Sequence, residues 1–323
     1  MKWMIGFLIL QTLFVAKPGL LADEAPDPQV VANLTRITAL SLDIVDDIAY
    51  VALGPSGLSV VDVSNPERPR VIGSVRTPSD AYEVKVVGNF AYVAGWAAGL
   101  VVVDISNPRA PRVVSSQRTP TNALTIDVVD GLIVVGCWNV NINGGDPRHG
   151  IVLYETTGPR PNRLANFNTP GWAGSVFIDG SLIYVADGPG GLLLVDSSDP
   201  ENPRTISSIE TRVRAYGVAV RDDIAFVADN SAGLAVIDAS DPRRMVTIER
   251  LAIPGASYDV SIRGDYAWVA STAGVFVVDI ANPNNVELLT NIPSSRARDV
   301  KFYKDHAYIA DSFGGLKIVQ IAR

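Results

Sequence analysis

Aromatic and amide side chains are the residues of this sequence whose chemistry best suits ligand binding. Residues 137–149 are rich in asparagine and contain one of the two histidines of the chain. The candidates in this segment are Trp138, Asn139, Asn141, Asn143 and His149. Exposed aromatic rings beside amide donors suit sugar rings or an extended peptide. We therefore expect a binding surface here, and the alternative is a compact loop that folds over its own Trp138.

Two further tryptophans and a set of arginines are candidates for the same surface. Trp96 and Trp172 are expected in turns and crossing segments next to the segment 137–149. The arginines are Arg212, Arg214, Arg296 and Arg298, with Arg36 near the start of the chain. An arc of guanidinium groups could hold a carboxylate or a phosphate. The alternative is that these arginines are solvated and paired with nearby acids.

Acidic residues raise the question of a metal site. Glu83, Asp259 and Asp299 are expected to lie near one another, and a Ca²⁺ site would need six to eight converging oxygen ligands. Further aspartates at turns are Asp187, Asp229 and Asp311. Carboxylates at turns also suit hydrogen bonds to the backbone, so we expect no cofactor and keep Ca²⁺ as the alternative.

Other catalytic and metal-binding patterns are missing from the sequence. Two histidines, His149 and His306, are too few for a multi-histidine zinc site. The single cysteine, Cys137, cannot form an intramolecular disulfide, and with His149 alone it lacks the orienting partner of a thiol protease. The glycines fall at regularly spaced turns and form no phosphate-binding motif.

Internal repeats must position these residues. A stretch such as GLSVVD, residues 57–62, recurs seven times along the chain. The repeats end at Asp62, Asp104, Glu155, Asp196, Asp238, Asp279 and Gln320, at intervals of 42, 51, 41, 42, 41 and 41 residues. The long interval contains the segment 137–149. A repeat of roughly 40–45 residues with four strands is typical of a β-propeller blade.

Each repeat predicts four strands. In the second repeat we expect an inner strand at 82–87, the next at 90–95, a third at 99–105 and an outer strand at 111–118. The third strand is apolar on successive residues, so both of its faces must be covered, as happens when blades stack. The last acid of the repeat is expected to bond backbone amides of the following turn. The aromatic residues at 50, 92, 184, 226, 268 and 308 are expected to pack between blades.

The chain ends predict how the propeller closes. The seventh repeat stops after its third strand, whereas residues 28–35 precede the first inner strand and resemble an outer strand. We expect this segment to complete the last blade, which removes an open sheet edge. The fold class is therefore all-β, a single seven-bladed propeller at 28–323. Its blades are expected, from inner to third strand, near 40–63, 82–105, 124–155, 174–197, 216–239, 258–280 and 298–321.

The repeat resembles a known family. GLSVVDVSNP at 57–66 and GLVVVDISNP at 99–108 look like the LVIVD repeat, as do YVAD at 184–187 and FVAD at 226–229. The resemblance covers essentially all of residues 28–323. It implies a propeller in an exported or surface protein of bacteria or archaea. It implies no established activity and no catalytic residues.

Composition and the first residues indicate location. Lys2 is followed by an apolar stretch at 4–16, which is typical of a signal peptide at 1–22 with a short linker at 23–27. Cleavage after Ala22 and retention as an anchor are the alternatives. We expect a periplasmic, secreted or cell-surface protein. The net charge of −7 argues against nucleic-acid binding, which needs clustered Lys and Arg.

These observations predict an interaction module. We expect a monomer without a transmembrane span in the mature chain. It would bind a protein or a glycan through the face that carries residues 137–149. The alternative is a hydrolase or lyase with Ca²⁺ at the channel mouth.

Overall fold

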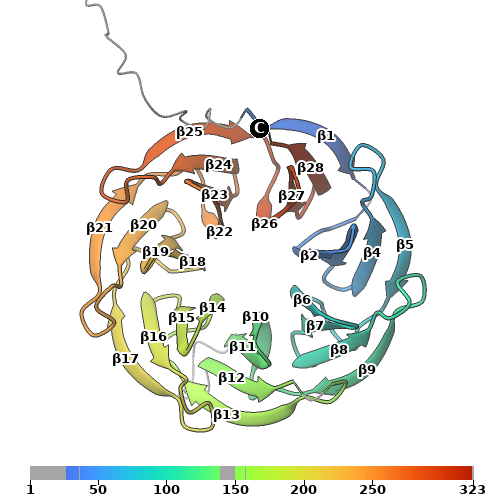
Figure 1. Cartoon of the computed structure of the whole chain (residues 1–323), viewed down its shortest axis with the longest axis horizontal. Helices are drawn as coiled ribbons and strands as arrows, with labels where there is room; N and C mark the ends of the chain where they lie inside the picture. The colour runs from blue at the N-terminus through green and yellow to red at the C-terminus, as the bar shows by residue number, and fades with distance from the viewer. Residues whose placement is uncertain (1–26, 36, 139–149, 157, 322–323) are drawn as a thin grey trace, which may run out of the picture.

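The protein is a disc of seven four-stranded antiparallel sheets arranged around a central channel (Figure 1). The computed structural model describes residues 27–35, 37–138, 150–156 and 158–321. Each blade runs from an inner strand at the channel to an outer strand at the rim. The predicted seven-bladed propeller is therefore confirmed. None of the described residues forms a helix long and apolar enough to cross a membrane.

The first four blades follow the chain in order. Blade one consists of β2 (Ser41–Val45), β3 (Ile48–Ala52), β4 (Leu58–Asp62) and β5 (Arg70–Val75). Blade two consists of β6 (Glu83–Val87), β7 (Phe90–Ala94), β8 (Leu100–Asp104) and β9 (Arg112–Gln117). Blade three consists of β10 (Asn122–Val129), β11 (Leu132–Trp138), β12 (Gly150–Glu155) and β13 (Asn162–Asn168). Blade four consists of β14 (Ser175–Asp179), β15 (Leu182–Ala186), β16 (Leu192–Asp196) and β17 (Arg204–Ile209).

The last three blades complete the circle. Blade five consists of β18 (Gly217–Arg221), β19 (Ile224–Ala228), β20 (Leu234–Asp238) and β21 (Val246–Leu251). Blade six consists of β22 (Ser257–Arg263), β23 (Tyr266–Ser271), β24 (Gly274–Asp279) and β25 (Glu287–Ile292). Blade seven consists of β26 (Ala297–Tyr303), β27 (His306–Asp311), β28 (Gly315–Gln320) and β1 (Gln29–Leu34).

The N-terminal strand β1 closes the last blade, as the sequence predicts. It pairs with β28 in antiparallel register, with Gln29 opposite Gln320 and Leu34 opposite Leu316. Figure 1 shows this blue strand beside the dark red C-terminal strands. Because β1 pairs with β28, the last blade has four strands like the others and β28 is not left as an open edge.

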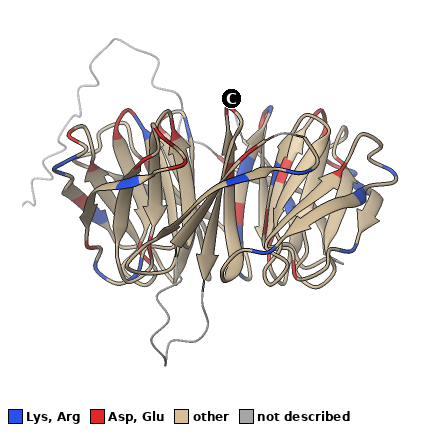
Figure 2. Ribbon diagram, turned by 90° about the horizontal axis from the view of Figure 1, so that it is seen from below, with Lys and Arg blue, Asp and Glu red and all other residues tan. Residues whose placement is uncertain are grey.

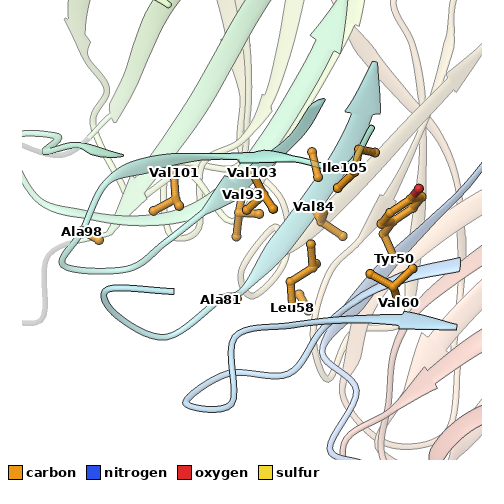
Figure 3. Packing of buried hydrophobic residues seen from close by; sticks show 12 residues of the cluster. Tyr50, Leu58, Val60, Ala81, Val84, Val93, Ala98, Val101, Val103 and Ile105 are labelled. Atoms are coloured by element: carbon orange, nitrogen blue, oxygen red, sulfur yellow. The ribbon is translucent and has the colours of Figure 1, made fainter. Parts of the chain in front are cut away.

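Blades pack through their apolar second and third strands. Tyr50, Leu58 and Val60 of blade one contact Val84 and Val93 of blade two in one buried cluster (Figure 3). The predicted aromatic positions all belong to such interfaces and are at most 4% exposed: Tyr50, Tyr92, Tyr184, Phe226, Trp268 and Tyr308. This packing is the main source of stability in an all-β repeat protein.

The disc has two unlike faces. We name as the hairpin face the one that carries the turns between first and second strands and between third and fourth strands. There Asp46 and Asp47 adopt positive φ of 51° and 62°, which aspartate tolerates better than most residues. The Asp62 carboxylate accepts a hydrogen bond from the Ser64 amide at 3.0 Å, as predicted, and four other blades repeat this contact. Figure 2 shows the disc edge-on with the acidic turns of this face uppermost.

The opposite face, which we name the mouth face, carries the turns between second and third strands. It also carries the segments that cross from each outer strand to the next inner strand. Each inner strand begins at this face, so its first residues surround the entrance to the channel.

Candidate functional site at the channel mouth

A cavity of about 330 Å³ opens at the channel entrance on the mouth face. Every blade contributes the residue at the start of its inner strand. These equivalent positions are Leu40, Tyr82, Leu124, Gly174, Tyr216, Tyr258 and Arg298. The repeat therefore places seven different side chains at one radius. Ser41, Glu83, Ser175, Asp259 and Asp299, each one residue further along its strand, add polar groups to the wall.

Aromatic rings run continuously around most of this entrance. Tyr82 stacks on Trp96 with ring centroids 4.8 Å apart, and Trp96 meets Trp138 edge-on at 5.7 Å. The run continues from Trp138 to Trp172 at 5.8 Å and from Trp172 to Tyr216 at 4.7 Å. It ends with Tyr216 and Tyr258 at 5.5 Å. We name these six residues the aromatic arc. All six side chains are partly exposed.

Two arginines occupy the gap in the arc. The Arg298 guanidinium lies 4.3 Å from the centroid of Tyr258, and that of Arg296 lies 5.5 Å from the same ring. Arg296 also donates to the Tyr258 hydroxyl at 2.9 Å, and Arg298 donates to Ser312 Oγ at 3.2 Å. Burial, together with the neighbouring Arg296 charge, lowers the pKa of Arg298. Neither Arg296 nor Arg298 forms an ion pair within the described residues, so neither shows the pairing with acids that was the alternative for these arginines.

Buried aspartates position the crossing segments that carry this site. Asp229, at the end of β19, accepts hydrogen bonds from the amides of Arg212, Val213 and Arg214 at 2.6–3.0 Å. This contact fixes the segment that leads directly into Tyr216. The Arg212 and Arg214 side chains are exposed and lie outside the cavity lining, so the structure separates them from Arg296 and Arg298.

The equivalent aspartates of two other blades act in the same way. Asp187 accepts from the Gly171 amide at 2.7 Å and from Thr169 Oγ1 at 2.5 Å, which holds the segment before Trp172. Asp311 accepts from the hydroxyls of Ser294 and Ser295 at 2.5 and 2.7 Å, and from the Arg296 amide at 3.1 Å. These carboxylates bond the backbone, which is the alternative to a metal that the sequence left open.

The pKa values of Asp187 and Asp311 are shifted in opposite directions. Burial raises the pKa of Asp187 to about 6, although its two hydrogen bonds oppose the change. Asp311 is also buried, but the Ser294 and Ser295 hydroxyls and the backbone amides outweigh that effect and lower its pKa to about 2. The number of donors around each carboxylate decides the sign of the shift.

The position of the Trp172 ring requires a glycine at residue 188, against which it packs. Gly188 has a φ of +51°, and a Cβ at this position would lie 2.5 Å from Cε2 of the Trp172 ring. Only glycine therefore allows the indole to lie flat on this turn. The contact places Trp172 within reach of both Trp138 and Tyr216.

The floor of the cavity holds a mixed charge cluster. Lys301 Nζ lies 2.7 Å from Asp299 Oδ1, and Asp299 Oδ2 accepts from the Leu42 amide at 3.1 Å. Burial raises the pKa of Asp259 well above its usual range, and the nearby Asp299 and Glu83 carboxyls add to this despite the Lys301 ammonium. Burial also raises the pKa of Glu83, against the effect of Lys85 and Lys301.

The three carboxyls considered as Ca²⁺ ligands thus share their surroundings with a lysine. Asp299, Asp259 and Glu83 together raise the pKa of Lys301, so the ammonium supplies the positive charge among them. Among the described residues, no group of three or more His, Cys, Asp or Glu side chains is arranged to hold a metal ion. Glu83 instead accepts from the Ile126 amide of the next blade at 3.1 Å.

Carboxylates of one inner strand also bond backbone amides of the next blade deeper in the channel. Asp43 accepts from the Val86 amide at 2.7 Å, and Asp127 accepts from the Ile178 amide at 2.9 Å. Lys85 lies 3.1 Å from Asp127. Sequence reasoning missed these residues. Alternation of charges along inner strands such as EVKVV of β6 could have found them.

The predicted binding residues fall into three groups. Trp96, Trp138 and Trp172 come together in the aromatic arc, and Arg296 and Arg298 join them at its end. Arg212 and Arg214 stand apart. The third group, Asn139, Asn141, Asn143 and His149, lies outside the described residues, as does Arg36.

Cys137 is buried, and burial raises its pKa to about 12, which keeps the thiol protonated and unreactive.

Three important residues of the site escaped the sequence analysis. Tyr82, Tyr216 and Tyr258 supply half of the aromatic arc. The signal was available, because all three occupy the same position of the repeat, at the start of the inner strand. That position varies among blades, whereas the aromatic of the second strand recurs in six of the seven repeats.

Comparisons with known proteins agree with the architecture. Crystal structures of similar shape include the WD40 β-propeller domain of Doa1, with a TM-score of 0.70, 11% identity, and coverage of 92% of this chain and 97% of that one. The computationally designed Ika8 protein has a TM-score of 0.63 and 11% identity, with coverage of 90% and 99%. Both likenesses concern the fold alone. No curated protein matches the chain in sequence.

A repeat family matches most of the propeller. The LVIVD repeat matches residues 38–77, 78–119, 170–211, 214–252, 254–292 and 295–322. The unmatched stretch between 119 and 170 corresponds to blade three, whose interval is the longest. The chain belongs to the LVIVD repeat family.

Proposed function

We propose that this protein is an exported interaction module that binds a glycan in the cavity at the channel mouth. The aromatic arc is the observation that carries the proposal. Its six partly exposed rings are in unbroken contact. Four of them, those of Tyr82, Trp138, Tyr216 and Tyr258, line the cavity to which all seven blades contribute. Side chains of this kind are usually buried or used in recognition.

The chemistry of the cavity suits a saccharide. The apolar faces of sugar rings pack on aromatic side chains, and their hydroxyl groups need nearby donors and acceptors. Ser41, Ser175, Glu83 and Asp259 supply such groups beneath the arc. A volume of about 330 Å³ is at the lower end of typical ligand sites, which suits one or two sugar residues at the end of a chain.

The sequence supports the location of this activity. Lys2 and the apolar stretch at 4–16 are typical of an export signal, so the ligand would be met outside the cytoplasm. A protein ligand is the alternative occupant of the mouth face.

Tryptophan fluorescence tests the proposal directly. Trp138 lines the cavity and contacts Trp96 and Trp172, so titration of the protein with an oligosaccharide panel should change its emission saturably. Tyr216→Ala should weaken the binding at least about tenfold, because one ring of a central contact surface is lost. The melting temperature should change little, since Tyr216 is partly exposed.

Phe313 provides the matched control. It lies in the turn between β27 and β28 on the mouth face, is 72% exposed, and is outside the cavity lining. Phe313→Ala should leave saccharide affinity unchanged. If no saccharide binds, the proposal fails. If a captured protein is lost on Phe313→Ala and retained on Tyr216→Ala, the mouth face binds a protein outside the cavity.

A further inference from the structure

We propose that the saccharide is acidic, and that Arg296 and Arg298 bind its anionic group. This inference rests on the proposed glycan-binding function and specifies the class of glycan. Both guanidinium groups lie on the same ring, Tyr258, at the end of the aromatic arc. A sugar ring packed on the arc would therefore present its substituent to them.

The two arginines form an unneutralised pair of like charges. Like charges at close range repel, and partly buried arginines normally face a carboxylate. The chain has 34 acidic residues against 27 Lys and Arg, so acids are not scarce. None of the ion pairs among the described residues involves Arg296 or Arg298.

Two carboxylates of the same blade are already engaged. Asp311 uses both oxygens on Ser294, Ser295 and the Arg296 amide. Asp299 is held by Lys301 and the Leu42 amide. Neither is therefore placed to neutralise the pair. In addition, Arg296 Nε is buried and has no hydrogen-bond partner. A ligand anion would neutralise the two guanidinium groups and would accept a hydrogen bond from Arg296 Nε.

The floor of the cavity does not repel an anion. Asp299 carries a charge balanced by Lys301 at 2.7 Å. Burial raises the pKa of Asp259 and Glu83, which favours their uncharged forms beneath the arc. Uncharged carboxyl groups both donate and accept, so they suit sugar hydroxyls. The cavity thus combines an apolar wall, a polar floor and one cationic corner.

Carboxylate and sulfate groups share this chemistry, since the planar guanidinium binds either through paired hydrogen bonds. Calorimetry with the full exported chain separates them. The probes are a tetra-uronate, its fully methyl-esterified form, a sulfated tetrasaccharide and a neutral tetrasaccharide. The uronate or the sulfated probe should bind at least about tenfold more tightly than the ester and the neutral probe.

Arginine variants assign the effect to the pair. Arg298→Gln and Arg296→Gln should each lower affinity for the acidic probe to that of its neutral counterpart, with little change for neutral probes. Arg298→Lys should restore part of the preference because it keeps the charge without the planar fork. Arg212→Gln is the matched control, because Arg212 is on the same face, exposed and outside the cavity lining.

The outcomes separate the inference from the function it rests on. Equal binding of acidic and neutral saccharides, with silent arginine variants, overturns the inference and leaves glycan binding intact. An equal loss with Arg212→Gln would show a diffuse attraction to the mouth face and also overturns it. Failure of every saccharide to bind overturns glycan binding itself.

Discussion

The two faces of the disc are built from the same repeat and use carboxylates in different ways. On the hairpin face, Asp62 and its equivalents each bond a turn two residues away, and the contact is exposed and local. On the mouth face, Asp187, Asp229 and Asp311 are buried and bond segments fifteen or more residues away in sequence. The first set shapes each blade, whereas the second positions the residues of the cavity.

This difference separates structural from functional positions within a repeat. On the hairpin face, most blades repeat the same hydrogen bond between an aspartate and a turn amide. At the mouth face, the residue that begins the inner strand changes from leucine to tyrosine, glycine or arginine around the circle. Variation at a position that the fold places on a common cavity is what a binding site in a repeat protein requires.

Removing one aspartate from each face should give the largest contrast. Asp229→Ala leaves three backbone amides without their acceptor and Arg250, 3.5 Å away, without its partner. At about 1–3 kcal/mol for each buried unsatisfied donor, we expect a loss of roughly 4 kcal/mol. Asp238→Ala removes one exposed turn contact and should cost about 1 kcal/mol. Urea unfolding of both variants measures the difference.

The same pair tests the link to the site. Asp229→Ala should also weaken saccharide binding at temperatures where it is folded, because the segment before Tyr216 is released. Asp238→Ala should bind as the parent protein does. Similar losses of stability in the two variants would refute the distinction between the faces.

The pH dependence of stability should differ within the mouth face itself. Asp311, with a pKa lowered to about 2, stabilises the fold above its usual value near 3.8, and this contribution is lost as pH falls toward 2. Asp187, with a pKa raised to about 6, binds its proton more tightly when folded, so stability falls as pH rises from about 4 to 6. Each effect amounts to roughly 2–3 kcal/mol.

Two asparagine variants measure these opposite slopes. The destabilisation by Asp311→Asn should be greatest above pH 4 and should shrink toward pH 2. Asp187→Asn should gain stability relative to the parent protein between pH 4 and pH 6. Thermal unfolding from pH 2 to pH 7 provides both curves, and parallel curves for the two variants would contradict the assigned shifts.

The smallest effect is expected at the hairpin face. Asp222→Asn combined with Asp223→Asn removes two charges while keeping a residue type that tolerates the φ of 51° and 60° found there. Stability should change by less than about 0.5 kcal/mol, since these are exposed turn residues. Saccharide affinity should be unchanged at about 0.1 M salt, where screening acts within about 10 Å. A marked change in affinity would show that the hairpin face contributes to binding.

The fold could be predicted from the sequence because the same blade motif is repeated seven times along the chain. Repetition exposed the role of Asp62 and of the buried aromatic at Tyr50, and the missing outer strand of the last repeat identified β1. The site was harder because it is formed between blades. Trp138 and Trp172 stood out as rare residues, but Tyr82 and Tyr258 resemble ordinary core tyrosines until the circle is closed.

Charge pairing was the least predictable property. Arg296 and Arg214 occupy the same position of the repeat, two residues before the start of the inner strand, yet Arg296 contacts Tyr258 whereas Arg214 is exposed. Likewise, the Lys301 ammonium pairs with Asp299 and is affected by Asp259 and Glu83 of other blades only because inner strands converge at the channel. Such contacts depend on distances between blades, which a repeat pattern does not encode.

The pairing of β1 with β28 also sets the orientation in which the molecule can be presented. Gln29 lies opposite Gln320, and β28 ends at the hairpin face, so the chain enters and leaves the propeller on that side. A partner joined directly at Gln29 or Gln320 would therefore lie on the hairpin face, opposite the aromatic arc. Attachment through the ends would leave the cavity unobstructed, which makes terminal immobilisation the natural geometry for capture experiments.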